Sequence, residues 1–310
     1  MRILAACMLL VCSTALGQAQ APAPPPAKPG EADTRIVLEV TNVNLQFTVT
    51  DKRGRFITDL TQKDFTVREG KNPQKILQFS AESNLPLRLA IVVDSSNSIR
   101  ERLKFIQESA IEFINSVMRP EQDKATVISF DAMPELQADL SGDIEQLTRV
   151  IRQLRAGGGT SLYDAIFFAS RDKLMQDQPR HKFRRAMVVL SDGEDNQSRY
   201  SRDQALELAQ KADVVIYTIS TNITRTETDG DKVLKYFAAE TGGMAFFPFK
   251  AEDLSQSFEN IANELRHQYS ILYRPEPLKT DGSYQRVEIL VKDRANLVVR
   301  SRRGYYAPTL

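Results

Sequence analysis

The chain has 310 residues, of which 42% are hydrophobic, so it is long enough to bury the core of one large α/β domain and a smaller unit. Its 41 lysines and arginines are balanced by 40 aspartates and glutamates, and the formal net charge is +1. This balance gives no long-range attraction to nucleic acid or to anionic membranes, so neither is expected as a partner. Any partner must be recognised through a local surface.

Residues 1–17 have the pattern of a secretory signal peptide. Arg2 precedes an apolar run from Ile3 to Val11, and small residues stand before the expected cleavage site. A linker rich in proline and alanine follows at residues 18–34. We therefore expect the chain to be exported, to the periplasm, the cell surface or the medium.

Both cysteines, Cys7 and Cys12, fall inside this predicted signal peptide. A mature chain without cysteine has no disulfide, thiolate metal site or cysteine nucleophile. No later apolar stretch reaches the roughly 18 to 20 residues that a membrane helix needs. We expect a mature chain that has no transmembrane anchor and is a monomer.

The segment at residues 35–84 has the alternation of a β-strand. From Val43 to Val49 every second residue is apolar and those between are polar, which predicts a strand with one buried face. The same alternation returns in the segment at residues 269–310. We expect the two segments to pack together as a small antiparallel β domain, with an α/β unit inserted between them.

Residues 87–268 alternate between short, wholly apolar β-type runs and stretches of helical periodicity. This alternation predicts a doubly wound α/β domain, in which helices cover both faces of a mostly parallel sheet. An antiparallel edge strand is expected at Glu135–Ala138. The expected parallel strands are Leu89–Val93, Thr126–Phe130, Ala186–Leu190, Val214–Ile219 and Met244–Phe247.

Three segments with oxygen-bearing side chains lie where open α/β sheets bind ligands, beyond predicted strands or at the start of a helix. They are Asp94 to Ser98, Gly157 to Thr160, and Ser191 to Asn196. Asp94, Ser96 and Ser98 are spaced two apart, so their side chains converge only if the backbone curls around a point above the strand. A hard cation at that point would explain the curl.

The combined donors suit a divalent cation. The carboxylates of Asp94 and Asp192 would balance its charge, and the hydroxyls of Ser96, Ser98 and Thr160 supply neutral oxygens. Oxygen ligands in octahedral geometry favour Mg²⁺ or Mn²⁺, and Ca²⁺ less, over zinc or copper. Because few ligands are anionic, the ion stays electrophilic. An Asp or Glu carboxylate of a protein partner would then complete the coordination sphere.

This pattern resembles the metal-ion-dependent adhesion site of von Willebrand factor type A (VWA) domains, and all five positions match. Members of the family are doubly wound α/β folds with the ion at the top of the sheet. The resemblance implies that Ser96, Ser98 and Thr160 contact the ion directly or nearly so. Asp94 and Asp192 would bind it directly or through water. The flanking segments, with Asp64-Phe65 and Arg303-Gly304-Tyr305-Tyr306, also resemble a bacterial subgroup of exported proteins that carry such domains.

Several of these residues have simpler interpretations. Ser98 would cap a helix that begins at Ile99, and Thr160 would cap the following helix. Asp164 would either hydrogen-bond to a metal ligand or interact favourably with a helix N-terminus. Glu194 and Asp195 would add oxygens around the ion, contact a partner, or form a solvated acidic loop. The metal site is favoured because three separate loops carry the required oxygens together.

Three functions compete at this point. The leading one is an exported, metal-dependent protein-binding module for adhesion or assembly, which is not an enzyme. A magnesium-dependent hydrolase or phosphotransferase is the alternative, but the loops offer no Asp-x-Asp pair, no histidine or lysine to activate Ser95 or Ser96, and no phosphate-binding loop. The third is a metal-free scaffold domain, which would have no need for the complete set of five ligands.

Overall fold

The computed structural model describes residues 42–81, 85–177, 182–222, 224, 226–248, 251–292, 294 and 296–309. The predicted signal peptide and linker lie outside these residues. Residues 40–310 form one compact unit, and the predicted domain boundaries within it remain predictions. None of the helices in the described ranges combines the length and the apolar character needed to cross a bilayer.

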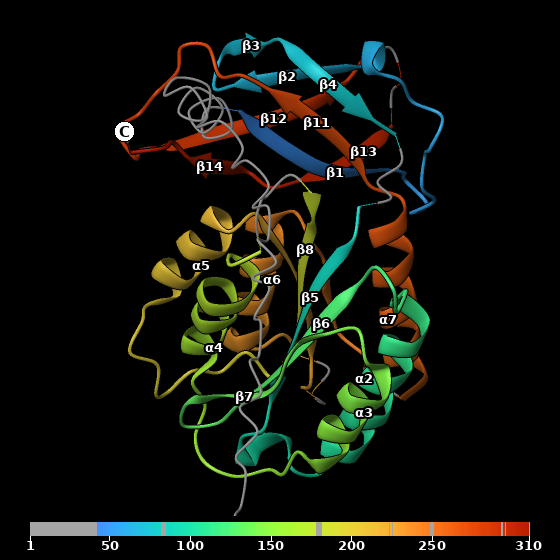
Figure 1. The fold of residues 1–310 in the computed structure, drawn as a ribbon, viewed down its shortest axis with the longest axis vertical. Coiled ribbons are helices and arrows are strands. Elements are labelled where there is room, and N and C mark those ends of the chain that lie inside the picture. Colours follow the sequence, from blue (N-terminus) through green and yellow to red (C-terminus); the bar gives the residue numbers. More distant parts are fainter. Residues whose placement is uncertain are drawn as a thin grey trace, which may run out of the picture. The chain divides into compact units, whose positions relative to one another are not determined.

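A six-stranded sheet in the order β10-β9-β8-β5-β6-β7 forms the centre of the α/β region (Figure 1). Neighbouring strands are parallel except β7, which runs antiparallel to β6. The predicted strands are confirmed, including the antiparallel edge. They are β5 (Leu87–Asp94), β6 (Lys124–Phe130), β7 (Pro134–Ser141), β8 (Arg184–Ser191), β9 (Val214–Ser220) and the short β10 (Ala245–Phe246).

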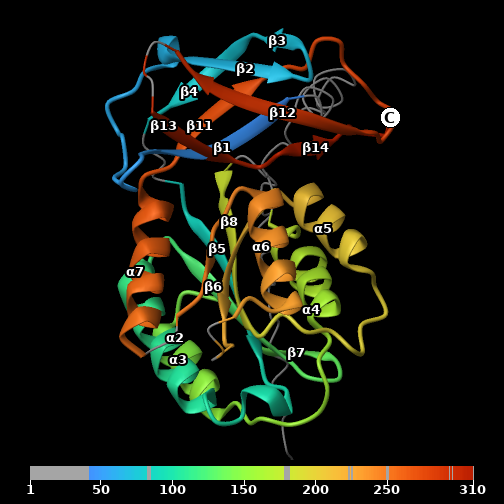
Figure 2. The ribbon, with the colours of Figure 1, turned by 180° about the vertical axis from the view of Figure 1, so that it is seen from behind.

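Helices cover both faces of this sheet (Figures 1 and 2). All eight residues of β5 are buried, as is typical of a strand covered on both faces. Ile91 packs in the core on one face and Val92 in the core on the other, which confirms the doubly wound α/β fold. One layer holds α2 (Leu103–Val117), α3 (Ile144–Gln153) and α7 (Ala251–Arg266); the other holds α4 (Leu162–Phe168), the π-helix η3 (Ala169–Leu174), α5 (Arg202–Lys211) and α6 (Asp229–Thr241).

Strands from the two ends of the chain form two antiparallel sheets, β13-β1-β11-β4 and β14-β12-β2-β3. In the first, β1 lies between β11 and β13; in the second, β2 pairs with β12. Phe47, Phe65 and Tyr269 meet in the core that these sheets enclose. The elements are β1 (Val43–Asp51), η1 (Gln62–Asp64), β2 (Phe65–Glu69), β3 (Asn72–Gln74), β4 (Ile76–Ser80), β11 (Tyr269–Tyr273), β12 (Tyr284–Val291), β13 (Leu297–Ser301) and β14 (Gly304–Tyr306).

Strand β1 departs in part from the predicted alternation. Its apolar residues, from Val43 to Val49, are buried as expected, but Thr48 and Thr50 on the polar face are buried too. The hydroxyl of Thr48 donates a hydrogen bond of 3.2 Å to Oε1 of Glu264 in α7. The second face of β1 is thus partly covered through a contact between residues far apart in the sequence, which periodicity does not reveal.

Candidate metal centre

Asp94 is the last residue of β5, and it is fully buried. Its Oδ1 accepts the backbone N–H of Ser96 at 2.8 Å, and its Oδ2 accepts the hydroxyl of Ser191 at 2.7 Å. Burial, with a smaller contribution from the charge of Asp192, raises the pKa of Asp94 to about 6 against the hydrogen bonds from Ser96 and Ser191. The charged form of a buried carboxylate that is repelled by a second carboxylate would be stabilised by a bound cation.

The two predicted serine ligands lie side by side. After Ser96 the backbone turns into the 3₁₀-helix η2 (Asn97–Ile99), and the Oγ atoms of Ser96 and Ser98 come to 2.9 Å from each other. Ser96 is the N-terminal boundary residue of η2, and Ser98 lies inside it. The simpler interpretation of Ser98 as the cap of a helix beginning at Ile99 is therefore wrong.

The backbone of Thr160 is hydrogen-bonded to the third of the three loops, the one that follows β8. Its N–H donates to Oδ1 of Asn196 at 3.0 Å, and its carbonyl accepts the N–H groups of Asn196 and Gln197. The hydroxyl of Thr160 makes no hydrogen bond within the described part of the chain, although the residue is only 4% exposed. The boundary residue of α4 is Ser161, so Thr160 does not cap that helix, and its hydroxyl is available to a ligand.

Hydrogen bonds connect all three loops. The carbonyl of Ser95 accepts the N–H of Gly157 at 2.7 Å, and the side-chain amide of Asn97 donates to the carbonyl of Gly158 at 3.1 Å. The second loop is joined to the third through Thr160 and Asn196. The sequence marks Ser191, Asn97 and Asn196 only as polar neighbours of the predicted ligands.

Asp192 is half-buried, and its Oδ1 accepts the N–H of Glu194 at 3.1 Å. Gly193 has a φ of +82°, which a residue with a side chain rarely adopts. The first turn of α6 packs directly against this backbone, since a Cβ atom at Gly230 would lie 2.2 Å from the carbonyl oxygen of Asp192. The close approach of α6 therefore fixes the position of the Asp192 loop.

We expect Gly230→Ala to weaken metal binding at this centre. Alanine normally stabilises a helix relative to glycine by about 1 kcal/mol, but here its Cβ would force the Asp192 backbone to move, at a cost of about 1–3 kcal/mol. Gln146→Ala is the control, because it also introduces alanine into a helix, at an exposed residue of α3 outside the three loops. Thermal unfolding and a metal titration of both variants test this. Equal behaviour of the two variants would contradict it.

The three secondary candidates differ in their contacts. Asp195 accepts the N–H of Tyr163 at 3.0 Å and the hydroxyl of Ser198 at 2.6 Å, and Asp164 accepts the N–H groups of Arg199 and Tyr200 at 2.9 Å each. Both carboxylates thus hold the start of α4 and the third loop together. Glu194 is exposed.

The donor set has few charged groups. Among the described residues, no group of three or more histidine, cysteine, aspartate or glutamate side chains is placed to hold a metal. The predicted centre instead combines two carboxylates with three hydroxyls. An oxygen-only set of this kind, at the carboxyl edge of the sheet, fits a small hard cation.

Comparison with known proteins identifies the class of this fold. Residues 89–194 match the family model of the von Willebrand factor type A domain. The human von Willebrand factor A domain-containing protein 3B is 28% identical over 180 residues, which cover 56% of this chain and 13% of that protein. The matched segment lies within the α/β region, and the chain spans only a small part of the length of this relative.

Two solved structures share the fold. The von Willebrand factor type A protein from Catenulispora acidiphila has a TM-score of 0.51 at 13% identity, covering 73% of this chain and 67% of its own. The vWF domain of the type V pili tip protein Mfa5 from Porphyromonas gingivalis has a TM-score of 0.50 at 15% identity. The match covers 59% of this chain and 96% of that domain's chain. At such identities these structures show a common fold with the α/β region of this chain.

Proposed function

We propose that this chain is an exported protein-binding module for adhesion or assembly, whose VWA domain binds a divalent cation through Asp94, Ser96, Ser98, Thr160 and Asp192. Mg²⁺ or Mn²⁺ is the proposed ion, ahead of Ca²⁺. An Asp or Glu carboxylate of a protein partner completes its coordination, and the module binds as a monomer. The pilus tip domain of Porphyromonas gingivalis, similar in fold, belongs to the kind of surface structure in which we expect such a module to act.

The observation that carries this proposal is the environment of Asp94. The carboxylate of Asp94 has no exposed surface, and burial together with the charge of Asp192 raises its pKa. It lies where hydrogen bonds join the loops that carry the three hydroxyl groups. Burial of such a group is unfavourable unless a positive charge compensates for it. A divalent cation would supply that charge. The hydroxyl of Thr160, which has no hydrogen-bond partner among the described residues, would supply a further ligand.

The serine hydroxyls favour a binding module over a hydrolase. The hydroxyl of Ser95 donates a hydrogen bond to the carbonyl of Phe130 at 3.0 Å, and the hydroxyls of Ser96 and Ser98 are hydrogen-bonded to each other. A nucleophilic serine needs a base within hydrogen-bond distance, and neither contact is with a base. Coordination of a metal by Ser96 and Ser98 requires no such activation.

The direct test is a titration of the intact chain with Mg²⁺ and with Mn²⁺. At a metal concentration 100 times the Kd, binding to the folded state stabilises it by about 2.7 kcal/mol, which raises the Tm by about 5 °C. Calorimetric titration should give one site per chain. The absence of any response to either ion at millimolar concentration would refute the metal half of the proposal.

The partner half requires a separate experiment. The chain, immobilised with Mg²⁺, is used to capture proteins from the cell-envelope fraction of its source. We expect a captured protein to be released by chelator and to lose binding when its own acidic residue at the contact is replaced. Capture that persists in chelator would contradict a metal-bridged contact while leaving metal binding itself intact.

A further inference from the structure

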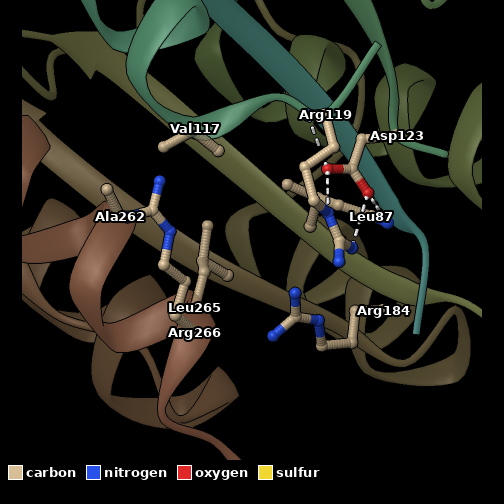
Figure 3. A pocket seen from close by; sticks show the side chains of 8 residues that line it. All are labelled: Leu87, Val117, Arg119, Asp123, Arg184, Ala262, Leu265 and Arg266. Atoms are coloured by element: carbon tan, nitrogen blue, oxygen red, sulfur yellow. Dashed lines mark hydrogen bonds and ion pairs between the residues drawn. The ribbon is translucent and has the colours of Figure 1, made fainter. Parts of the chain in front are cut away.

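A cavity of about 220 Å³ lies at the edge of the central sheet opposite Asp94. Leu87 and Arg184 line it, and they are the first residues of the parallel strands β5 and β8, whose last residues are Asp94 and Ser191. The end of α2 contributes Val117, and α7 contributes a further wall. Figure 3 shows the guanidinium groups of Arg119, Arg184 and Arg266 around the same space.

Arg184 is a buried cation that forms no ion pair with the residues that the structure describes. The residue is 5% exposed, and its Nε and Nη1 are shielded from solvent with no hydrogen-bond partner in the part of the chain that the structure describes. Burial lowers the pKa of Arg184 to about 10, so the side chain remains charged at neutral pH. An unpaired buried charge is destabilising, and such groups are normally paired or bound to a ligand.

The one carboxylate in the cavity wall is already engaged. Asp123 accepts Nε and Nη2 of Arg119 at 3.0 and 3.1 Å, and it also accepts the backbone N–H of Leu87 at 2.7 Å. Arg266 donates from Nη2 to a carbonyl, that of Ser116, at 2.6 Å. Three arginines and one aspartate leave the lining with two positive charges.

We propose that this cavity is a binding site for a compact oxyanion with two negative charges, such as phosphate, whose oxygens accept hydrogen bonds from Arg184 and Arg266. One water molecule needs about 10–15 Å³ of such space, so the cavity has room for an oxyanion together with several waters. Guanidinium groups suit this role because they present several planar donors to an oxyanion. The site uses none of the residues of the metal centre.

Inorganic phosphate is the probe, added at constant ionic strength against chloride in metal-free buffer. At 100 times its Kd, phosphate should raise the Tm of the intact chain by about 5 °C. Arg184→Met keeps an unbranched side chain without the charge, and we expect it to weaken phosphate binding at least tenfold in calorimetric titration. Without phosphate, this variant should melt no lower than the original chain, because an unpaired buried cation has been removed.

Arg152→Met is the matched control, since Arg152 is exposed on α3 and does not line the cavity. It should respond to phosphate like the original chain. A second arm with methyl phosphate separates free from esterified phosphate, because only a site with space beyond the anion will bind the ester.

The proposal is overturned if phosphate has no effect beyond that of chloride, or if Arg184→Met responds like Arg152→Met. Should Arg184→Met not fold, Arg184→Lys replaces it. That variant keeps the charge but loses the planar donors, and we expect a severalfold weaker Kd. An unchanged Kd in Arg184→Lys would equally refute the role of the guanidinium group.

Discussion

Replacing Glu264 with alanine is expected to lower the free energy of unfolding by about 3 kcal/mol. Glu264 is buried in α7; it accepts the hydroxyl of Thr48 in β1 and pairs with Nη2 of Arg300 in β13 at 3.3 Å. Its removal leaves Arg300 without a counter-ion, and Nε of Arg300 is already buried without a partner among the described residues. Because the Arg300 side chain is 26% exposed, the loss should fall at the lower end for a broken buried pair.

Urea unfolding of Glu264→Ala and of the original chain measures the difference in the free energy of unfolding. Two further variants show whether the loss comes from the buried ion pair. Glu207→Ala breaks the exposed ion pair with Lys211 on α5, and it should change stability by less than about 0.5 kcal/mol. The double variant Glu264→Leu/Arg300→Met should recover most of the lost stability, because apolar residues often replace a buried pair without loss. A loss below about 1 kcal/mol in Glu264→Ala would show that the pair contributes little.

Glu264 also illustrates what the sequence does not predict. The alternation of β1 predicts its strand, and the apolar face of α7 is visible as a periodic pattern in the same way. The pairing of Glu264 with Thr48 and Arg300 joins residues 216 positions apart in one direction and 36 in the other, as the numbering shows. Since periodicity reports only which face of an element is apolar, it cannot identify a polar residue that is buried by a distant partner.

The three loops of the candidate metal centre show the opposite case, because part of their arrangement could be predicted. The central strands could be predicted because parallel strands buried on both faces are short, continuous apolar runs. The positions of Asp94 and Asp192 then followed from the rule that ligands bind beyond the carboxyl ends of such strands. Thr160 instead lies between α3 and α4, in the segment predicted to open a helix. The contacts that hold the loops in place, such as Ser191 to Asp94 and Asn196 to Thr160, depend on the curl of each loop and were not predicted.

Asp192→Ala is expected to weaken the binding of Mg²⁺ and Mn²⁺ at least 100-fold, about 2.7 kcal/mol, because the variant removes one of two anionic ligands. Asp192 suits this test better than Asp94. Within the described ranges its side chain accepts only the N–H of Glu194, whereas loss of the Asp94 carboxylate would leave the Ser191 hydroxyl and the Ser96 N–H without that partner. The fold of the apo protein should therefore change little in Asp192→Ala.

Glu121→Ala is the control for this variant, because it removes the same charge from an exposed residue. Glu121 precedes the first residue of β6, at the opposite end of that strand from the candidate metal centre. Its affinity for both ions should equal that of the original chain. If Asp192→Ala also kept that affinity, the ion would have to bind elsewhere, and the proposed ligand set would be wrong. If it lost metal binding and chelator-sensitive capture of a partner together, the bound ion would itself be part of the recognition surface, since no other group at this edge of the sheet changes in the variant.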